Sequence, residues 1–358
     1  MSGEASAPAD STSDPGSESD AGSPTFDRRT LAKAVVGFAI AGVLLYLLGS
    51  VVGWERITRA LADADADPLW VAVACASTLL YLLAWTKTWD VVLTAGAISV
   101  SYRRLVPTFF AATFANYTTP FGQAGGEPFI AYVLATDTEA SYEQSLASVS
   151  TADLLNLFPF FTFAGLGLAA LVATGEVPPG TRPLVAGLAA IAVGVPAVVV
   201  VGWYRREFIE NAIVRVTGPV VRRTERIDAE GIRERIDGFY GQLGRIASDP
   251  RDLLVAVSFS YIGWVFFALP LYFAALALSL PLDPLLVVFL VPASSLAGIT
   301  PTPGGLGGVE AALVALVVAL TPIAAGPAAA LAIAYRATSY WFALVTCGPM
   351  ALYVTARA

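Results

Sequence analysis

Long apolar runs, separated by short polar stretches, dominate the chain after residue 30. Runs of about 20 residues predict helices that cross the bilayer, and they occur at about 31–52, 69–94, 145–172, 184–204, 253–279 and 328–354. They are continuous rather than alternating, which argues against a membrane β-barrel. We therefore expect an all-α fold: a polytopic transmembrane helical bundle with about six full spans, forming one membrane domain over residues 28–358.

Two further apolar regions are interrupted by glycine and proline. Residues 104–118 and 124–135 flank the first interruption, and residues 284–299 and 306–320 flank the second. A helical arm of about 16 residues is about 24 Å long, which is shorter than a hydrocarbon core of about 30 Å. We interpret each pair of arms as a re-entrant helical hairpin. The alternative is two tilted, shortened spans per pair, which raises the number of hydrophobic segments from eight to ten.

The two interruptions share a motif. Thr119–Glu127 and Thr302–Glu310 lie 183 residues apart, and their Thr, Pro, two Gly and final Glu coincide. Residues 29–173 and 184–355 each contain two spans, a hairpin and a last span, and they start from opposite sides of the membrane. This organisation predicts inverted repeats, which in secondary transporters place the substrate site at broken helices between the repeats.

Composition supports the membrane assignment and narrows the chemistry. The chain is 56% hydrophobic and 14% charged, with a mean hydropathy of +0.68, which is atypical of a soluble domain. It contains no histidine and two cysteines, both in apolar runs. Because the usual general base and metal ligands are missing, we expect no metal, no cofactor and no enzymatic activity. Residues 1–27 are polar and acidic, and we expect them to form a disordered tail.

Charge placement predicts the orientation. The loop at 205–251 carries ten arginines, which places it in the cytoplasm against the anionic inner leaflet. Both termini then lie in the cytoplasm, and the protein is expected in the cell membrane. The formal net charge is −7 and nearly all 21 basic residues are arginine. This acidic, lysine-poor composition indicates a haloarchaeal source, and no nucleic-acid partner is expected.

Each interruption ends in a carboxylate. Glu127 and Glu310 open the second arms of their hairpins, where an anion is stabilised by the helix dipole. In one interpretation both only cap broken helices. In the other they line a polar cavity and bind a cationic group, a proton or a coupling ion. Glycines let a ligand approach free backbone amides, and those expected to contribute are Gly125, Gly126, Gly304, Gly305 and Gly307.

Two charges fall inside predicted spans. Asp153 and Arg336 each follow the motif Glu of their repeat by 26 residues. Each lies about 12 Å deep, where an unpaired charge costs at least about 2.5–3.5 kcal/mol. We therefore expect both to face the interior and to form an ion pair with each other or share a ligand. Arg336, with Tyr340 one turn later, is the expected phosphate ligand.

A second charged pair lies toward the end of the predicted span at 69–94. Lys87 and Asp90 are one helical turn apart, next to Trp85 and Trp89. Tryptophan is typical of the membrane–water interface. We interpret this group as an interfacial anchor with a local ion pair.

Three segments, Tyr117–Pro128, Thr300–Glu310 and Tyr335–Trp341, resemble the lysylphosphatidylglycerol synthase transmembrane region, also called the flippase-like domain family. The resemblance covers about residues 30–355. In bacterial members it implies a membrane domain that moves aminoacylated phospholipid between leaflets, in some cases with a fused lysyl transferase. Because the chain ends at Ala358, soon after its last span, we do not expect that transferase here. The resemblance implies headgroup contact by Glu127, Glu310 and Arg336.

The favoured function is therefore a flippase-like translocase for a phosphate-bearing lipid, either a phospholipid or a polyprenyl-linked lipid. In this hypothesis Arg336 and hairpin amides hold the phosphate, and alternating access moves it. The first alternative is an ion-coupled transporter of a small solute. The second is a non-transporting membrane partner of a separate glycosyltransferase or lipid-modifying enzyme. A cavity that opens toward lipid would favour the translocase over the solute transporter.

Overall fold

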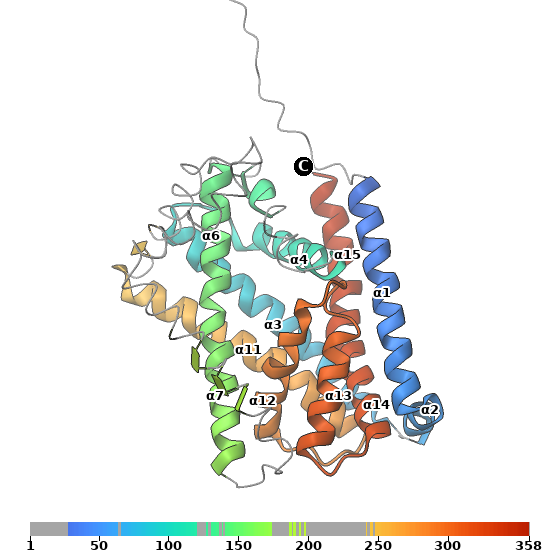
Figure 1. Ribbon diagram of the computed structural model, residues 1–358. Helices are drawn as coiled ribbons and strands as arrows, with labels where there is room; N and C mark the ends of the chain where they lie inside the picture. Colours follow the sequence, from blue (N-terminus) through green and yellow to red (C-terminus); the bar gives the residue numbers. More distant parts are fainter. Residues whose placement is uncertain are drawn as a thin grey trace, which may run out of the picture.

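The computed structural model describes residues 28–63, 66–119, 127, 130–135, 138, 140–173 and 250–357, with isolated positions between 186 and 249. Over the ranges described, the regular elements are helices arranged as a bundle (Figure 1). This confirms the all-α membrane fold. The predicted acidic tail and the basic loop lie outside these ranges, as does nearly all of the predicted span at 184–204.

Within the described residues, five helical stretches are long and apolar enough to cross a membrane. They match five of the six predicted spans. They comprise α1 (Arg28–Val52), α3 (Pro68–Ala95), the consecutive helices α6 (Tyr142–Leu155) and α7 (Leu157–Ala173), α11 (Pro250–Ala277), and the consecutive helices α14 (Ala325–Arg336) and α15 (Phe342–Thr355). A short helix, α2 (Trp54–Asp63), follows α1.

The second interrupted region forms a hairpin. Helix α12 (Pro284–Ser295) continues into a short 3₁₀ helix, η2 (Leu296–Ile299), and α13 (Gly308–Leu320) returns after the glycine break. Both arms are shorter than the spans, and Figure 1 shows them standing at the same end of the bundle. This arrangement matches the re-entrant interpretation of this pair.

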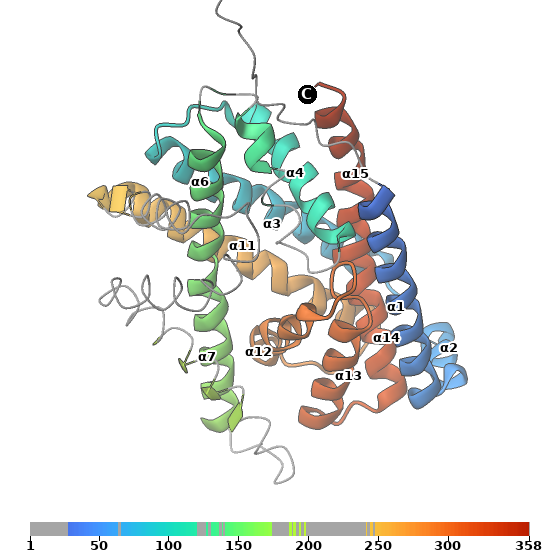
Figure 2. The same cartoon turned by 45° about the horizontal axis from the view of Figure 1, so that its top comes forward.

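The first interrupted region is described in part. Its first arm is α4 (Tyr102–Thr118), and the return arm is represented by Glu127 and helical residues 130–135. Figures 1 and 2 place α4 toward the end of the bundle opposite to α12 and α13. The two broken regions therefore approach the middle of the bundle from opposite ends.

Three of these helices begin with the same dipeptide. Asp67, Asp249 and Asp283 each precede a proline, and each carboxylate accepts a hydrogen bond from a backbone N–H of the first turn, at 2.9, 2.9 and 2.7 Å. An aspartate at the N-cap with proline at the first helical position is a strong local start signal. It fixes where α3, α11 and α12 begin after their polar connections.

The helix bounds follow the 183-residue offset of the glycine breaks. At this offset α3 falls on α11, and α6 with α7 falls on α14 with α15. The packing follows the same relation, because α4 packs against α15 while α12 packs against α7, and α3 packs along α11. In the α3–α11 contact, Gly263 lies so close to the Trp85 indole that a Cβ would overlap it. These matched bounds and contacts support two related repeats.

Candidate functional site

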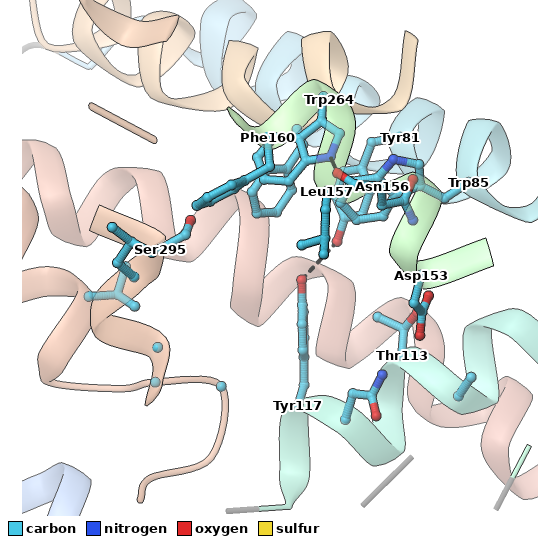
Figure 3. Close-up of a pocket in the computed structure, with 18 of the residues that line it drawn as sticks. Tyr81, Trp85, Thr113, Tyr117, Asp153, Asn156, Leu157, Phe160, Trp264 and Ser295 are labelled. Atoms are coloured by element: carbon cyan, nitrogen blue, oxygen red, sulfur yellow. Dashed lines mark hydrogen bonds between the residues drawn. The ribbon is translucent and has the colours of Figure 1, made fainter. Parts of the chain in front are cut away.

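A cavity of about 890 Å³ lies between the two predicted repeats, with lining residues from both. It is lined by residues of α3, α4, α6, α7, α11, α12, η2, α13 and α14, together with the glycine break and Glu127. Figure 3 shows the lining side chains converging from these elements. Of the predicted site residues, Glu127, Asp153, Gly304, Gly305 and Arg336 line this cavity. Among these predicted residues, Glu127 and Arg336 are the furthest apart in the sequence, by 209 positions.

Arg336 is held by the second hairpin. Its Nε donates to Glu310 Oε1 at 2.8 Å, and Nη2 donates to the Gly304 carbonyl at 2.7 Å. The guanidinium also lies 4.4 Å from the centre of the Tyr340 ring. The Arg336 and Glu310 side chains are 12% and 4% exposed. A pair this deeply buried needs close geometry to offset its desolvation, and these contacts supply it.

Glu310 has two roles at once. Its Oε2 accepts a hydrogen bond from the Gly307 backbone N–H at 2.7 Å, which caps the first turn of α13. Its other oxygen binds Arg336. Glu310 is not among the residues that line the cavity. The structure thus bears out the capping interpretation of Glu310, and its carboxylate pairs with Arg336 instead of lining the cavity.

The predicted Asp153–Arg336 ion pair is wrong. Arg336 pairs with Glu310, and the Asp153 carboxyl group lies within hydrogen-bonding reach of Glu127. The reason lies in the packing of each hairpin. The returning arm α13 packs against α14, so the motif Glu of a repeat meets the charge on the last span of the same repeat. Asp153 and Arg336 still face one cavity, so a shared ligand stays a prediction.

The acidic end of the cavity has unfilled hydrogen-bonding capacity. Glu127 accepts a hydrogen bond from Ser150 at 3.4 Å. The Trp89 indole lies beside Asp153, yet its Nε1 closes no hydrogen bond of good geometry, although Trp89 is only 3% exposed. The Asn116 Oδ1 is likewise buried without a partner. Buried polar atoms in native proteins are nearly always paired, so these groups retain hydrogen-bonding capacity that the described residues do not fill.

The glycines of the second break meet specific neighbours. Gly304 has a φ of +56° and faces the Tyr340 ring, and Gly305 has a φ of +66° and lies against Gly298. Gly307, with a φ of +84°, packs against Leu44 of α1 rather than lining the cavity. These values lie in the left-handed region, where a side chain is strained. Gly125 and Gly126 lie outside the described residues.

Tyr340 lies behind the cavity wall and joins the two broken regions. Its hydroxyl donates to the Tyr117 carbonyl at the end of α4, at 2.9 Å, and the two rings pack with centres 5.1 Å apart. The Tyr117 hydroxyl is 3.1 Å from that of Tyr81 on α3 (Figure 3). Residues 337–341 form a π-helical turn, in which the Thr338 carbonyl accepts a hydrogen bond from Thr78 at 2.9 Å. The π-turn was not expected from the sequence.

Aromatic residues form most of one wall of the cavity. Trp85, Trp264, Phe267 and Phe160 pack edge to face or tilted, with ring centres 5.3–5.8 Å apart. The predicted Lys87–Asp90 ion pair is confirmed, at 2.5 Å. Its two neighbouring tryptophans were misassigned, because Trp85 and Trp89 line the cavity instead of anchoring the interface. Position in the sequence did not reveal which face of α3 they occupy.

The edge of the cavity is apolar and open. Leu157, at the start of α7, is 36% exposed, and Ile299, at the end of η2, is 82% exposed. Both line the cavity, together with Leu296 and Phe161. In a membrane-spanning bundle, exposed apolar side chains are matched by acyl chains rather than water. This edge therefore suits contact with lipid.

Comparison with known proteins places this architecture in a family. The family model for the lysylphosphatidylglycerol synthase TM region matches residues 34–347. The chain is 30% identical to a UPF0104 membrane protein of Methanothermobacter thermautotrophicus over 88% of its own length and 90% of the relative. A second UPF0104 membrane protein of that organism is 26% identical over 86% and 92% of the two lengths.

A third relative differs in length. The glycosyltransferase AglD of Haloferax volcanii is 25% identical over 84% of this chain, but the match covers 50% of that protein. The family match covers nearly all of the described bundle, including the second glycine break and Arg336. The chain is a multi-pass membrane protein that belongs to the lysylphosphatidylglycerol synthase TM region family.

Proposed function

We propose that this protein is a flippase-like translocase that moves a phosphate-bearing lipid, a phospholipid or a polyprenyl-linked lipid, between membrane leaflets. The observation that carries the proposal is the cavity between the repeats. It combines partly buried charged groups, Glu127, Asp153 and Arg336, with the exposed apolar edge at Leu157 and Ile299. A lipid has the same two parts, a polar headgroup and apolar tails. A small-solute transporter has no use for an edge open to acyl chains.

The cavity offers a place for a phosphate. Among the described lining residues, Arg336 supplies the cation, and it lies next to Gly304 and Gly305 of the broken hairpin. Arginine forms strong, charge-assisted hydrogen bonds to phosphate. An arriving phosphate would exchange for Glu310 at the guanidinium, so binding and release are coupled to opening of the buried pair. The family membership supports a lipid-related role.

We propose cytoplasmic termini in the cell membrane. In Figure 1, α1 begins and α15 ends at the same end of the bundle. The arginine-rich segment at 205–251, which would contact the anionic inner leaflet, favours the cytoplasm for that end. Alternating access would then carry the headgroup past the cavity by relative movement of the two repeats. In this proposal the protein transports and does not catalyse.

A second candidate is a membrane partner of a glycosylation or lipid-modifying enzyme. It is favoured by the alignment of 84% of this chain with half of a protein named a glycosyltransferase. The candidate is tested by purifying the protein from its native membrane and identifying enzymes that remain bound. The buried charges around the cavity favour transport, because a passive anchor has no need for them.

The test of the translocase is leaflet transfer in vesicles that contain the purified full chain. The fluorophores of short-chain labelled phospholipids are reduced chemically from outside the vesicles, which removes the signal of the outer leaflet. Faster loss of the remaining signal, from the inner leaflet, reports transfer between leaflets. We expect the Asp153→Asn variant to transfer at least about tenfold more slowly than the wild type, because one missing charged contact is worth more than about 1.4 kcal/mol. Asp90→Asn, which changes a carboxylate of the same type outside the cavity, is the matched control and should transfer normally. Wild-type vesicles that behave like protein-free vesicles with phospholipid and polyprenyl lipid alike would refute the proposal.

A further inference from the structure

The acidic end of the cavity has a hydrogen-bonding pattern that selects among headgroups. Glu127 and Asp153 offer carboxyl oxygens, and the buried Asn116 Oδ1 is a further acceptor without a partner. The Trp89 N–H is a buried donor without a closed hydrogen bond, at the same end. A bound group must therefore both donate to oxygens and accept from an N–H.

The common headgroup components differ in this respect. A phosphate only accepts hydrogen bonds, and it would be repelled by Glu127 and Asp153. An ammonium only donates, and it would leave the Trp89 N–H unpaired. A hydroxyl group does both. Leaving a buried donor or acceptor unpaired costs its full desolvation, so a group with several hydroxyls fits this end best.

The neighbouring wall supports the same class of ligand. Trp264, Phe160 and Phe267 present aromatic rings to the same cavity that Glu127 and Asp153 line. Polyols and sugars have C–H faces as well as hydroxyl edges, so one face packs on rings while the edges hydrogen-bond. Arg336 at the other end is already neutralised by Glu310, which leaves the carboxyl end as the less satisfied part of the cavity.

We propose that the Glu127–Asp153–Trp89 end of the cavity binds a polyhydroxylated headgroup, a sugar or a similar polyol, of the transported lipid. This proposal rests on the proposed lipid translocase and names the class of its substrate. The carboxyl groups and Asn116 accept from hydroxyls, and Trp89 donates to a hydroxyl oxygen. The phosphate, where the lipid has one, lies toward Arg336.

Four lipids with identical tails separate these chemistries in a binding assay. Phosphatidic acid carries phosphate alone, phosphatidylethanolamine adds an ammonium, phosphatidylinositol adds a polyol, and glucosyl diacylglycerol has the polyol without phosphate. Binding to the purified full chain in detergent is followed by its tryptophan fluorescence, since three tryptophans line the cavity. We expect the two polyol lipids to bind at least about tenfold more tightly than the other two. Equal or tighter binding of phosphatidic acid or phosphatidylethanolamine would overturn the proposal.

The Trp89→Phe variant tests the donor directly, because it keeps a ring and removes the N–H. We expect it to weaken binding of both polyol lipids by about tenfold and to leave phosphatidic acid binding unchanged. Trp70→Phe, on the same helix but stacked on Phe273 outside the cavity, is the matched control and should change neither. An equal loss for all four lipids would assign Trp89 to packing and overturn its role.

Two further experiments are needed. One separates a lipid-linked polyol from a soluble polyol, and the other tests the proposed translocase separately from the binding site. Free inositol and glucose are added as competitors; full competition at concentrations similar to those of the lipids would assign the site to a soluble polyol and overturn the lipid assignment. Leaflet transfer of the same four lipids is measured separately. Tight binding of the polyol lipids without transfer would support the binding site and refute the translocase.

Discussion

The buried ion pair between Glu310 and Arg336 predicts that the conservative substitution Glu310→Gln strongly destabilises the protein. If Glu310 only capped a helix N-terminus, this change would cost little stability, because a neutral side chain is accepted there. The structure changes that expectation. Glu310 uses one oxygen for Arg336, at 2.8 Å, and the other for the Gly307 N–H, at 2.7 Å. A glutamine keeps one oxygen and places an NH₂ group against the other donor.

The expected loss follows from burial. The two side chains are 4% and 12% exposed, so water does not replace the lost acceptor. One charge-assisted hydrogen bond is worth about 1.5–3 kcal/mol, and a buried cation without its anion brings the cost of breaking such a pair to about 3–5 kcal/mol. The Gly304 carbonyl and the Tyr340 ring still hold Arg336, which favours the lower part of this range.

The measurement is reversible unfolding of the purified protein in mixed micelles, followed by tryptophan fluorescence. Glu55→Gln is the control: Glu55 pairs with Arg59 at 3.6 Å on exposed α2, and an exposed pair is worth less than about 1 kcal/mol. The double variant Glu310→Leu with Arg336→Met removes both charges and should recover most of the loss. If Glu310→Gln unfolds within about 0.5 kcal/mol of the wild type, the pair does not hold the hairpin and the reasoning fails.

Two further predictions concern the frame around the cavity. Gly263→Ala should destabilise the protein by about 1–3 kcal/mol, because a Cβ would overlap the Trp85 ring and overpacking carries such a cost; Gly42→Ala, with nothing within 4 Å, should be neutral or slightly stabilising in the same unfolding assay. Thr78→Val should cost about 1–3 kcal/mol by leaving the Thr338 carbonyl of the π-turn without its buried donor, and an unchanged unfolding curve would show that the π-turn satisfies this carbonyl in another way.

The fold was largely predictable because its signals are local. Apolar runs set the spans, Asp-Pro pairs mark three helix starts, and five predicted spans lie within a few residues of the helices observed. The shared offset of the glycine breaks also predicted which helices correspond. These signals need no knowledge of which helix lies beside which, and burial of an apolar helix in a membrane does not depend on its neighbours.

The candidate site was predictable for some of its members but not for its pairing. The cost of a charge inside a span pointed to Asp153 and Arg336, which both line the cavity, and the glycine motif pointed to Glu310. Which charge meets which depends on the return of α13 against α14, a tertiary contact that has no sequence signal. The tryptophans of α3 were missed for a similar reason. Indole side chains occur both at membrane interfaces and in cavity walls. The rotation of α3 about its own axis decides which of these positions they take.

The opposite charges at equivalent positions of the two repeats have an energetic consequence. In a protein built from two identical inverted repeats, exchanging their conformations would give two end states of equal free energy. Here one repeat contains a cation, Arg336, that is neutralised by Glu310 of the hairpin of the same repeat, and the other contains two neighbouring carboxyl groups. Exchange therefore cannot give equal free energies. In the proposed alternating access, the cavity of the empty protein would open mainly toward one side of the membrane. The ligand that pairs best with the two carboxyl groups shifts the equilibrium between the two conformations most.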